Sequence, residues 1–210
     1  VNLRARGASL ADIAILVVDI RTGFQAQTFE SLELLKAYKV PFVVAANKID
    51  RLPGWKSYPE TPFIVSLRKQ TPTAVNNLEF ALDRIIEDLY KHGFLADRYD
   101  RVRDFRKVVA IVPTCALNGE GLADLLLLLA GLAGKFLRHK LKLHLGMPRG
   151  NVLEVRKIPG AGTVIDVILV DGKIHPGDWL VVGGRDGVIV TKIRSLFLPK
   201  PLDEIRDPRD

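Results

Sequence analysis

The sequence predicts an α/β fold for its first part and a small antiparallel β domain after it. Up to about residue 150, continuous apolar runs of strand length alternate with segments of helical periodicity, which is typical of a parallel sheet covered by helices. After Gly150 the pattern changes to short, alternating β-branched runs cut by turn sequences. We therefore expect two domains, 1–146 and 147–210, with the boundary at the segment MPRG (147–150).

Three strands and three helices are expected in the first domain. Uninterrupted apolar runs predict a strand buried on both faces over residues 12–19, a second buried strand over 41–47 and a third strand over 107–114. Apolar residues at helical spacing predict helices over residues 28–39, 71–93 and 121–141. The second of these helices has the clearest ends, because Thr71 suits the N-cap, Pro72 the first turn and Gly93 the stop.

The second domain is predicted to be a small antiparallel β-barrel that is truncated. The turn sequences PGAG, DG, PGD and GG divide the segment after Gly150 into about five strands, and the tail LPKPLDEIRDPRD has no strand pattern. Five strands can form an open barrel, whereas closing one often takes more. We therefore expect only part of this domain in the chain.

Composition excludes several classes of protein. The chain has 210 residues, 48% of them hydrophobic, and a single cysteine, Cys115, which rules out an internal disulfide framework and fits a reducing compartment. The longest apolar block, 122–136, is interrupted and too short for a membrane span. The four histidines show no metal-ligand spacing. We expect a cytoplasmic monomer without a membrane segment or a metal site.

Positive charge is concentrated in the first domain. The net charge is +7, and residues 150–210 contribute none of it. No acidic residue lies between Asp124 and Glu154, and five cationic residues fall in that gap: Lys135, Arg138, Lys140, Lys142 and Arg149. Two interpretations are open, a solvated helix face or a phosphate-facing surface that contacts RNA. The charged run 97–107 (DRYDRVRDFRK) has a similar pair of interpretations, a salt-bridged loop or a contact with ribosomal RNA.

The tetrapeptide Asn47-Lys48-Ile49-Asp50 begins at the last residue of a predicted strand, at the end where doubly wound sheets bind their ligands. Guanine presents two adjacent N–H donors on one edge, and the carboxylate of Asp50 can accept both, whereas adenine lacks this donor pair. Lys48 has an apolar stem that can lie along a base, and Asn47 can bond to the ring edge or brace the neighbouring loop. This segment predicts a site that recognises guanine.

A second candidate segment, TCALNGEG (114–121), lies at the end of another predicted strand and leads into a helix. Two glycines around Glu120 permit a tight turn, and the backbone N–H groups of Cys115 and Ala116 can approach a ligand closely. Taken alone, the segment is also typical of an ordinary strand-to-helix turn. Its pairing with the first segment on a nearby strand favours a ligand site.

Together, the two segments resemble the fourth and fifth guanine-recognition motifs of a GTP-binding domain. The stretches VNLRARGASLADIAILVVDI, PFVVAANKIDRLPGW and KIRSLFLPKPLDEIRD are similar to archaeal and eukaryotic translation initiation factor 5B, a relative of bacterial initiation factor 2, and the resemblance covers essentially the whole chain. It implies a partial P-loop GTPase-type sheet followed by a β-barrel domain, with GTP or GDP as the ligand. By resemblance, guanine contacts come from Asn47, Lys48, Asp50, Cys115, Ala116 and Leu117. Cys115 and Leu117 depart from the pattern, since the family usually has serine at the first position and many GTP-binding proteins have lysine at the second.

The phosphate-binding motifs of such a domain do not occur in this sequence. It contains neither G-x-x-x-x-G-K-[ST] nor D-x-x-G. We therefore expect the back half of a GTPase domain, without catalytic residues, which does not hydrolyse GTP by itself. Mg²⁺ is expected only together with the missing front half.

The resemblance also implies partners for the parent factor. These are the ribosome and its RNA during subunit joining, and the initiator tRNA through later domains. Two alternatives stay open: a non-enzymatic module that binds ribosomal or other RNA, and a translational GTPase of the elongation or selenocysteine-specific type. The long insert at 71–107 speaks against the second alternative by resemblance.

Overall fold

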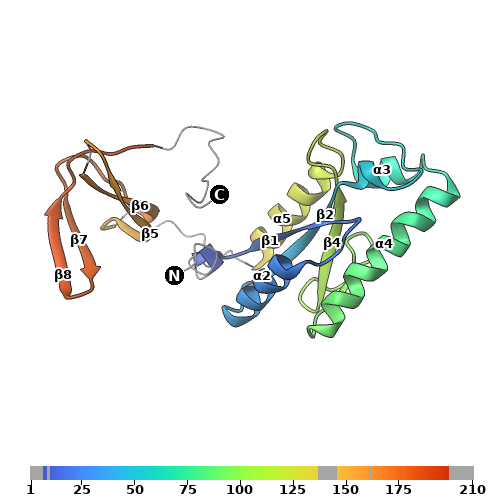
Figure 1. Cartoon of the computed structure of the whole chain (residues 1–210), viewed down its shortest axis with the longest axis horizontal. Coiled ribbons are helices and arrows are strands. Elements are labelled where there is room, and N and C mark those ends of the chain that lie inside the picture. The colour runs from blue at the N-terminus through green and yellow to red at the C-terminus, as the bar shows by residue number, and fades with distance from the viewer. Residues whose placement is uncertain (1–6, 9, 137–145, 161, 199–210) are drawn as a thin grey trace. The chain divides into compact units, whose positions relative to one another are not determined.

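The computed structural model describes residues 7–8, 10–136, 146–160 and 162–198 (Figure 1). The chain divides into two compact units, Val1–Lys142 and Leu143–Asp210. The first unit is an α/β layer structure, and the second consists of antiparallel strands.

The first unit is built on a four-stranded parallel sheet in the order β1-β2-β4-β3. Three of its strands confirm the positions of the predicted ones, with ends shifted by at most two residues: β1 (Ala14–Asp19), β2 (Phe42–Asn47) and β4 (Val108–Thr114). The predicted burial of the first strand on both faces was wrong, because Ile15 and Val17 on one face of β1 are exposed. Along β2, Val44 and Ala46 belong to one hydrophobic cluster, whereas Val43 and Ala45 belong to the other. This burial on both faces explains why the strand is a continuous apolar run in the sequence.

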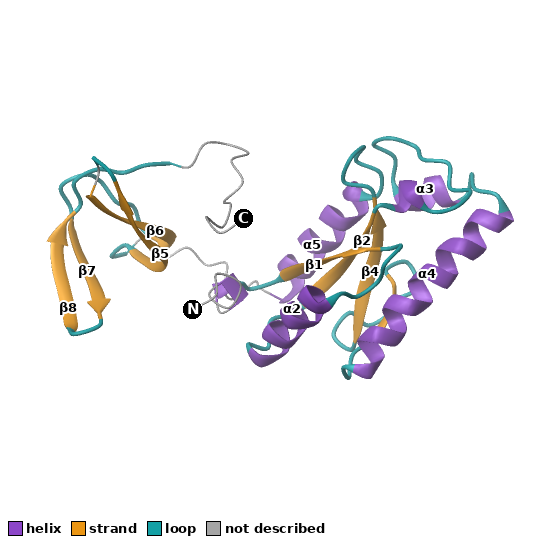
Figure 2. Ribbon diagram, viewed as in Figure 1, coloured by secondary structure: helices purple, strands orange, loops and turns teal. Residues whose placement is uncertain are grey.

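Helices cover both faces of the sheet (Figure 2). Helices α2 (Ala26–Ala37) and α4 (Pro72–Lys91) contribute Leu32 and Leu78 to the larger core, and α5 (Leu122–Phe136) packs on the opposite face through Leu125. Helix α4 begins as predicted, because the Thr71 side chain accepts the Ala74 N–H at 3.3 Å. The part of the predicted helix 121–141 beyond α5 lies outside the described residues.

Three short elements of the first unit were not predicted. They are the 3₁₀ turn η1 (Ile49–Arg51), helix α3 (Phe63–Leu67) and strand β3 (Leu95–Arg98). β3 runs parallel to the start of β4, so the prediction of a loop from residue 97 onward was wrong for its first two residues. The predicted salt bridges are present, because the buried guanidinium of Arg98 contacts Glu79 and Asp100. A four-residue strand that ends in Asp97 and Arg98 has no apolar run by which to recognise it.

The second unit contains two antiparallel hairpins in its described part. One pairs β5 (Arg149–Ile158) with β6 (Gly162–Asp171), and the other pairs β7 (Trp179–Gly184) with β8 (Gly187–Lys192). The two hairpins are separate two-stranded sheets, so the described residues hold four of the roughly five strands expected. None of the described side chains in this unit is fully buried. The tail from residue 199 lies outside the described residues.

Candidate functional site

The two candidate segments meet at one edge of the parallel sheet. In the strand register, Asp19 pairs with Asn47 and Asn47 pairs with Thr114, so β1, β2 and β4 end at the same level. Because parallel strands share their direction, the residues that follow these strands lie along a common edge. The segment 47–50 is thereby placed beside the segment 114–121.

Asn47 fastens the two segments to each other. Its Oδ1 atom accepts the backbone N–H of Ala116 at a distance of 2.9 Å. Of the two roles considered for Asn47, bonding to a ring edge and bracing the neighbouring loop, the structure shows the second. The side-chain amide group of Asn47 keeps its own donors for other partners.

Asp50 is oriented by Cys115. The thiol Sγ donates to Asp50 Oδ1 at 3.0 Å, and the Asp50 side chain is about one-fifth exposed. Burial, followed by the neighbouring carboxylate, raises the pKa of the Cys115 thiol above its ordinary value. The group is therefore protonated at neutral pH and acts as a hydrogen-bond donor. Cys115, which stands where the family usually has serine, therefore acts as a hydrogen-bond donor to Asp50.

Lys48 adopts a left-handed backbone conformation, with φ of 70°. Such a conformation costs a residue other than glycine roughly 1 kcal/mol and is found preferentially at functional sites. The Lys48 ammonium donates to Asp19 Oδ2 at 3.0 Å, from the end of β1.

Asp19 also caps the turn that follows β1, because its Oδ1 accepts the Arg21 N–H at 3.0 Å. Burial alone would raise the pKa of the Asp19 carboxyl, but the bonds from Lys48 and Arg21 hold it below its ordinary value. Asp19 thus both caps this turn and pairs with Lys48, and it was not predicted from the sequence to be part of the site.

The turn after β4 depends on glycine. Gly121 has a φ of +74°, and a Cβ atom on it would lie 2.3 Å from the carbonyl oxygen of Pro113. The turn leaves Ala116 exposed, and Leu117 is 86% exposed. The predicted contact residues of this segment therefore differ in setting, with Cys115 buried and the two residues after it at the surface.

The predicted RNA-facing residues are only partly described. Lys135 lies in the last turn of α5 and Arg149 is the exposed first residue of β5, so they belong to different units. Arg138, Lys140 and Lys142 lie outside the described residues.

No group of three or more potential metal-binding side chains occurs in the described ranges. In the same ranges, no helix is both long and apolar enough to cross a bilayer.

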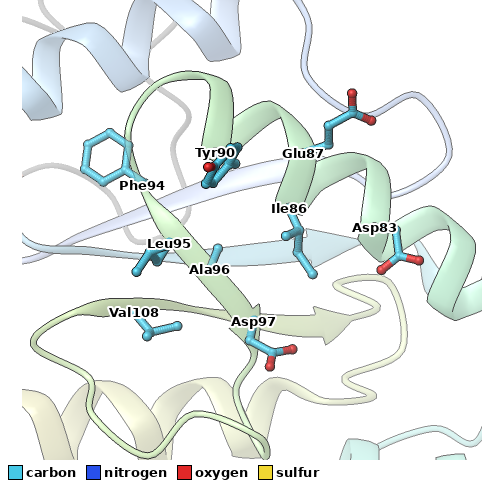
Figure 3. Close-up of a pocket in the computed structure, with 9 residues that line it drawn as sticks. All are labelled: Asp83, Ile86, Glu87, Tyr90, Phe94, Leu95, Ala96, Asp97 and Val108. Atoms are coloured by element: carbon cyan, nitrogen blue, oxygen red, sulfur yellow. The ribbon is translucent and has the colours of Figure 1, made fainter.

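A groove of about 430 Å³ lies elsewhere in the first unit, between α4 and β3 (Figure 3). Its lining includes the apolar residues Phe94 and Val108 and the acidic residues Asp83, Glu87 and Asp97, and the Glu87 carboxylate points away from β3. Two of these carboxylates already have partners, because Glu87 pairs with Lys91 at 2.7 Å and Asp97 accepts the Arg98 N–H. The groove shares no residue with the predicted guanine contacts.

Comparisons with known proteins agree with the fold. Residues 1–135 match the family described as the elongation factor Tu GTP binding domain. The probable translation initiation factor IF-2 of Staphylothermus marinus is 56% identical over 205 residues, which are 98% of this chain and 34% of that protein. The protein of the same name from Pyrococcus abyssi is 56% identical over 209 residues, which are 99% of this chain and 21% of that protein.

Solved structures give the same result. The crystal structure of GDP-bound aIF5B from Aeropyrum pernix is 46% identical, with a TM-score of 0.87 over 96% of this chain and 35% of that one. A bacterial selenocysteine-specific elongation factor, EF-Sec, is 21% identical with a TM-score of 0.57, which shows a shared fold alone. The chain spans between about a fifth and a third of the length of the initiation factors that it matches. These comparisons confirm the resemblance found in the sequence, and the chain belongs to the translational GTPases that carry the elongation factor Tu GTP binding domain.

Proposed function

We propose that this chain is the guanine-recognition part of a GTP-dependent translation initiation factor that promotes ribosomal subunit joining. The observation that carries the proposal is the pair of bonds across the sheet edge, from Ala116 to Asn47 and from Cys115 to Asp50. These bonds bring one carboxylate and one side-chain amide to the end of a parallel sheet, where such folds bind nucleotides. Unit 1 would then be the back part of the GTP-binding domain, and unit 2 the first part of the β-barrel domain that follows.

Each residue has a defined role in this proposal. Asp50 accepts the two N–H groups on one edge of guanine, and Cys115 holds the carboxylate in place by donating to Oδ1. The stem of Lys48 lies along the base while its ammonium stays on Asp19. The Ala116 N–H already donates to Asn47, so a bound base carbonyl would share or replace that acceptor. Leu117 adds an apolar surface at the rim.

Phosphate chemistry would come from other parts of the parent factor. The sequence contains neither the Gly-rich phosphate loop nor a D-x-x-G segment. By resemblance to the family, Mg²⁺ would be held together with the phosphates. We therefore propose that the 210-residue chain binds the base but does not hydrolyse GTP. The ribosome, its RNA and the initiator tRNA are the proposed partners of the whole factor.

The proposal is tested by calorimetric titration of the chain with guanosine, GDP and GTP, with adenosine as the control. Weak binding that is similar for guanosine and GDP, and absent for adenosine, is the expected result. Much tighter binding of GDP than of guanosine would reveal a phosphate site that the sequence does not indicate. Release of phosphate from GTP by the purified chain in the presence of ribosomes would contradict the proposed inactivity.

The thiol of Cys115 provides a first prediction. Cys115→Ala removes the donor to Asp50 and is expected to weaken guanosine binding about fivefold, the equivalent of one lost hydrogen bond. Cys115→Ser retains a donor of similar reach, and its hydroxyl is the stronger donor. We expect it to bind guanosine at least as tightly as the wild type. Equal affinities of the alanine variant and the wild type, measured on fully folded protein, would show that the thiol does not orient Asp50.

A further inference from the structure

We propose that the segment 53–61 positions the guanine-contacting loop through the buried carboxylate of Glu120, and that Trp55 and Ser57 are positioning residues for base recognition. The inference deepens the proposed function and rests on it, because it concerns the same site. Neither Trp55 nor Glu120 reaches a base itself, since both side chains are buried.

Glu120 is completely buried and is held by two side-chain donors. Its Oε1 accepts the indole N–H of Trp55 at 3.3 Å, and its Oε2 accepts the hydroxyl of Ser57 at 2.5 Å. A buried carboxylate is costly unless donors satisfy its oxygens. Its position in the core is therefore fixed by the segment that supplies those donors.

The same carboxylate lies on the loop that carries the guanine contacts. The backbone carbonyl of Glu120 accepts the Cys115 N–H at 2.8 Å, and the Cys115 carbonyl accepts the Gly119 N–H at 2.9 Å. Residues 115 to 120 therefore form one closed turn, in which Cys115 donates to Asp50 and Ala116 donates to Asn47. A displacement of Glu120 would therefore also displace Cys115 and Ala116, which are the two donors.

Further hydrogen bonds, one between side chains and two between backbone groups, join the loop to the segment 53–61. The Asn118 side chain donates to Ser57 Oγ at 2.6 Å, and the Asn118 carbonyl accepts the Glu60 N–H at 2.9 Å. The Gly121 N–H donates to the carbonyl of Thr61 at 3.0 Å. The guanine-contacting loop is thus bonded to one neighbouring segment through Asn118, Glu120 and Gly121.

The segment 53–61 is itself held by contacts with α3 and with Gln70, which lies between α3 and α4. The indole ring of Trp55 lies parallel to the ring of Phe63 on α3, with centroids 6.2 Å apart. The Gln70 side chain bonds both backbone groups of Lys56, accepting its N–H at 2.9 Å and donating to its carbonyl at 2.7 Å. The segment follows Asp50 closely in the chain, so one continuous stretch carries the Asp50 carboxylate and is bonded to the opposite loop.

The test uses substitutions that remove a hydrogen-bond donor but keep a side chain of similar shape. Trp55→Phe keeps an aromatic ring on Phe63 but removes the donor to Glu120, leaving a buried carboxylate oxygen without a partner. We expect guanosine affinity to fall about tenfold in the full 210-residue chain, with the protein still folded by circular dichroism. Trp179→Phe is the matched control, because Trp179 is the chain's other tryptophan, lies in the second unit and is largely exposed.

A second substitution separates the effect of the missing donor from that of the smaller aromatic ring. Glu120→Gln removes the buried charge, keeps an acceptor for Trp55 and can donate to the Ser57 hydroxyl. In the double variant Trp55→Phe/Glu120→Gln, the missing donor faces a neutral amide and costs less. We therefore expect the double variant to regain most of the guanosine affinity that Trp55→Phe loses, which a loss caused by the smaller ring alone would not show.

Hydrogen exchange of the Ala116 amide reports the loop without any ligand. We expect this amide to be protected in the wild type and to exchange at least tenfold faster in Trp55→Phe. Wild-type guanosine affinity and unchanged Ala116 exchange in folded Trp55→Phe would overturn the positioning role and leave the proposed function intact. Absence of guanosine binding by the wild type would instead overturn the proposed function, and the exchange measurement would still decide the positioning role.

Discussion

Replacing Asp50 by asparagine is expected to weaken guanosine binding by roughly a hundredfold. A carboxylate can accept both N–H donors on one edge of guanine, whereas the asparagine amide sets its own NH₂ donors against one of them. The geometry of the loop should survive, because the asparagine carbonyl can still accept the Cys115 thiol that donates to Oδ1 in this structure. The effect should therefore appear in affinity and not in the folding of the domain.

The selectivity of the Asp50→Asn variant gives a sharper test than the loss alone. Xanthosine has a carbonyl where guanosine has its exocyclic amine, so that edge presents one donor and one acceptor. An asparagine side chain also has one acceptor and one donor group, and we expect the variant to prefer xanthosine to guanosine. Calorimetry with both nucleosides measures this preference. Asp83→Asn, an exposed carboxylate on α4, is the matched control and should bind guanosine as the wild type does.

The parallel sheet was predictable because its signal is local and strong. Strands such as β2 are buried on both faces, and an uninterrupted apolar run of strand length has few other interpretations. Strand β3 was not predictable for the opposite reason, since Asp97 and Arg98 occur in a four-residue edge strand that depends on its pairing with β4. The elements that could be predicted are those whose own residues show the pattern of a buried strand or helix, without reference to a pairing partner.

The same distinction holds for the candidate site. Asn47, Lys48 and Asp50 could be named from the sequence, because their order after a strand matches the chemistry of one base edge. Trp55 and Ser57 could not be connected with Glu120, which lies more than sixty residues away along the chain. A tryptophan alone indicates packing, and a glutamate between two glycines indicates a turn. Only the folded structure shows that the tryptophan donates a hydrogen bond to the glutamate.

Gly121 is the position at which the fold and the site depend most on a single residue. It needs a positive φ of +74°, and a Cβ there would lie 2.3 Å from the Pro113 carbonyl oxygen and 3.3 Å from the Thr114 Cα. These neighbours are backbone atoms of β4, which cannot turn aside as a flexible side chain would. The clash adds to the cost of the left-handed conformation, so we expect Gly121→Ala to lower the free energy of unfolding by about 3 kcal/mol.

A glycine in open space provides the matched control for that substitution. Gly131 lies in α5, is exposed, and has no atom within 4 Å of the position of an added Cβ. Alanine favours a helix over glycine, so Gly131→Ala should raise the free energy of unfolding by roughly 0.5–1 kcal/mol. Urea denaturation followed by circular dichroism at the helical band measures both variants. If Gly121→Ala were as stable as the wild type, the close approach of the turn to β4 would be wrong, and with it the placement of Cys115 and Ala116 beside Asp50 and Asn47.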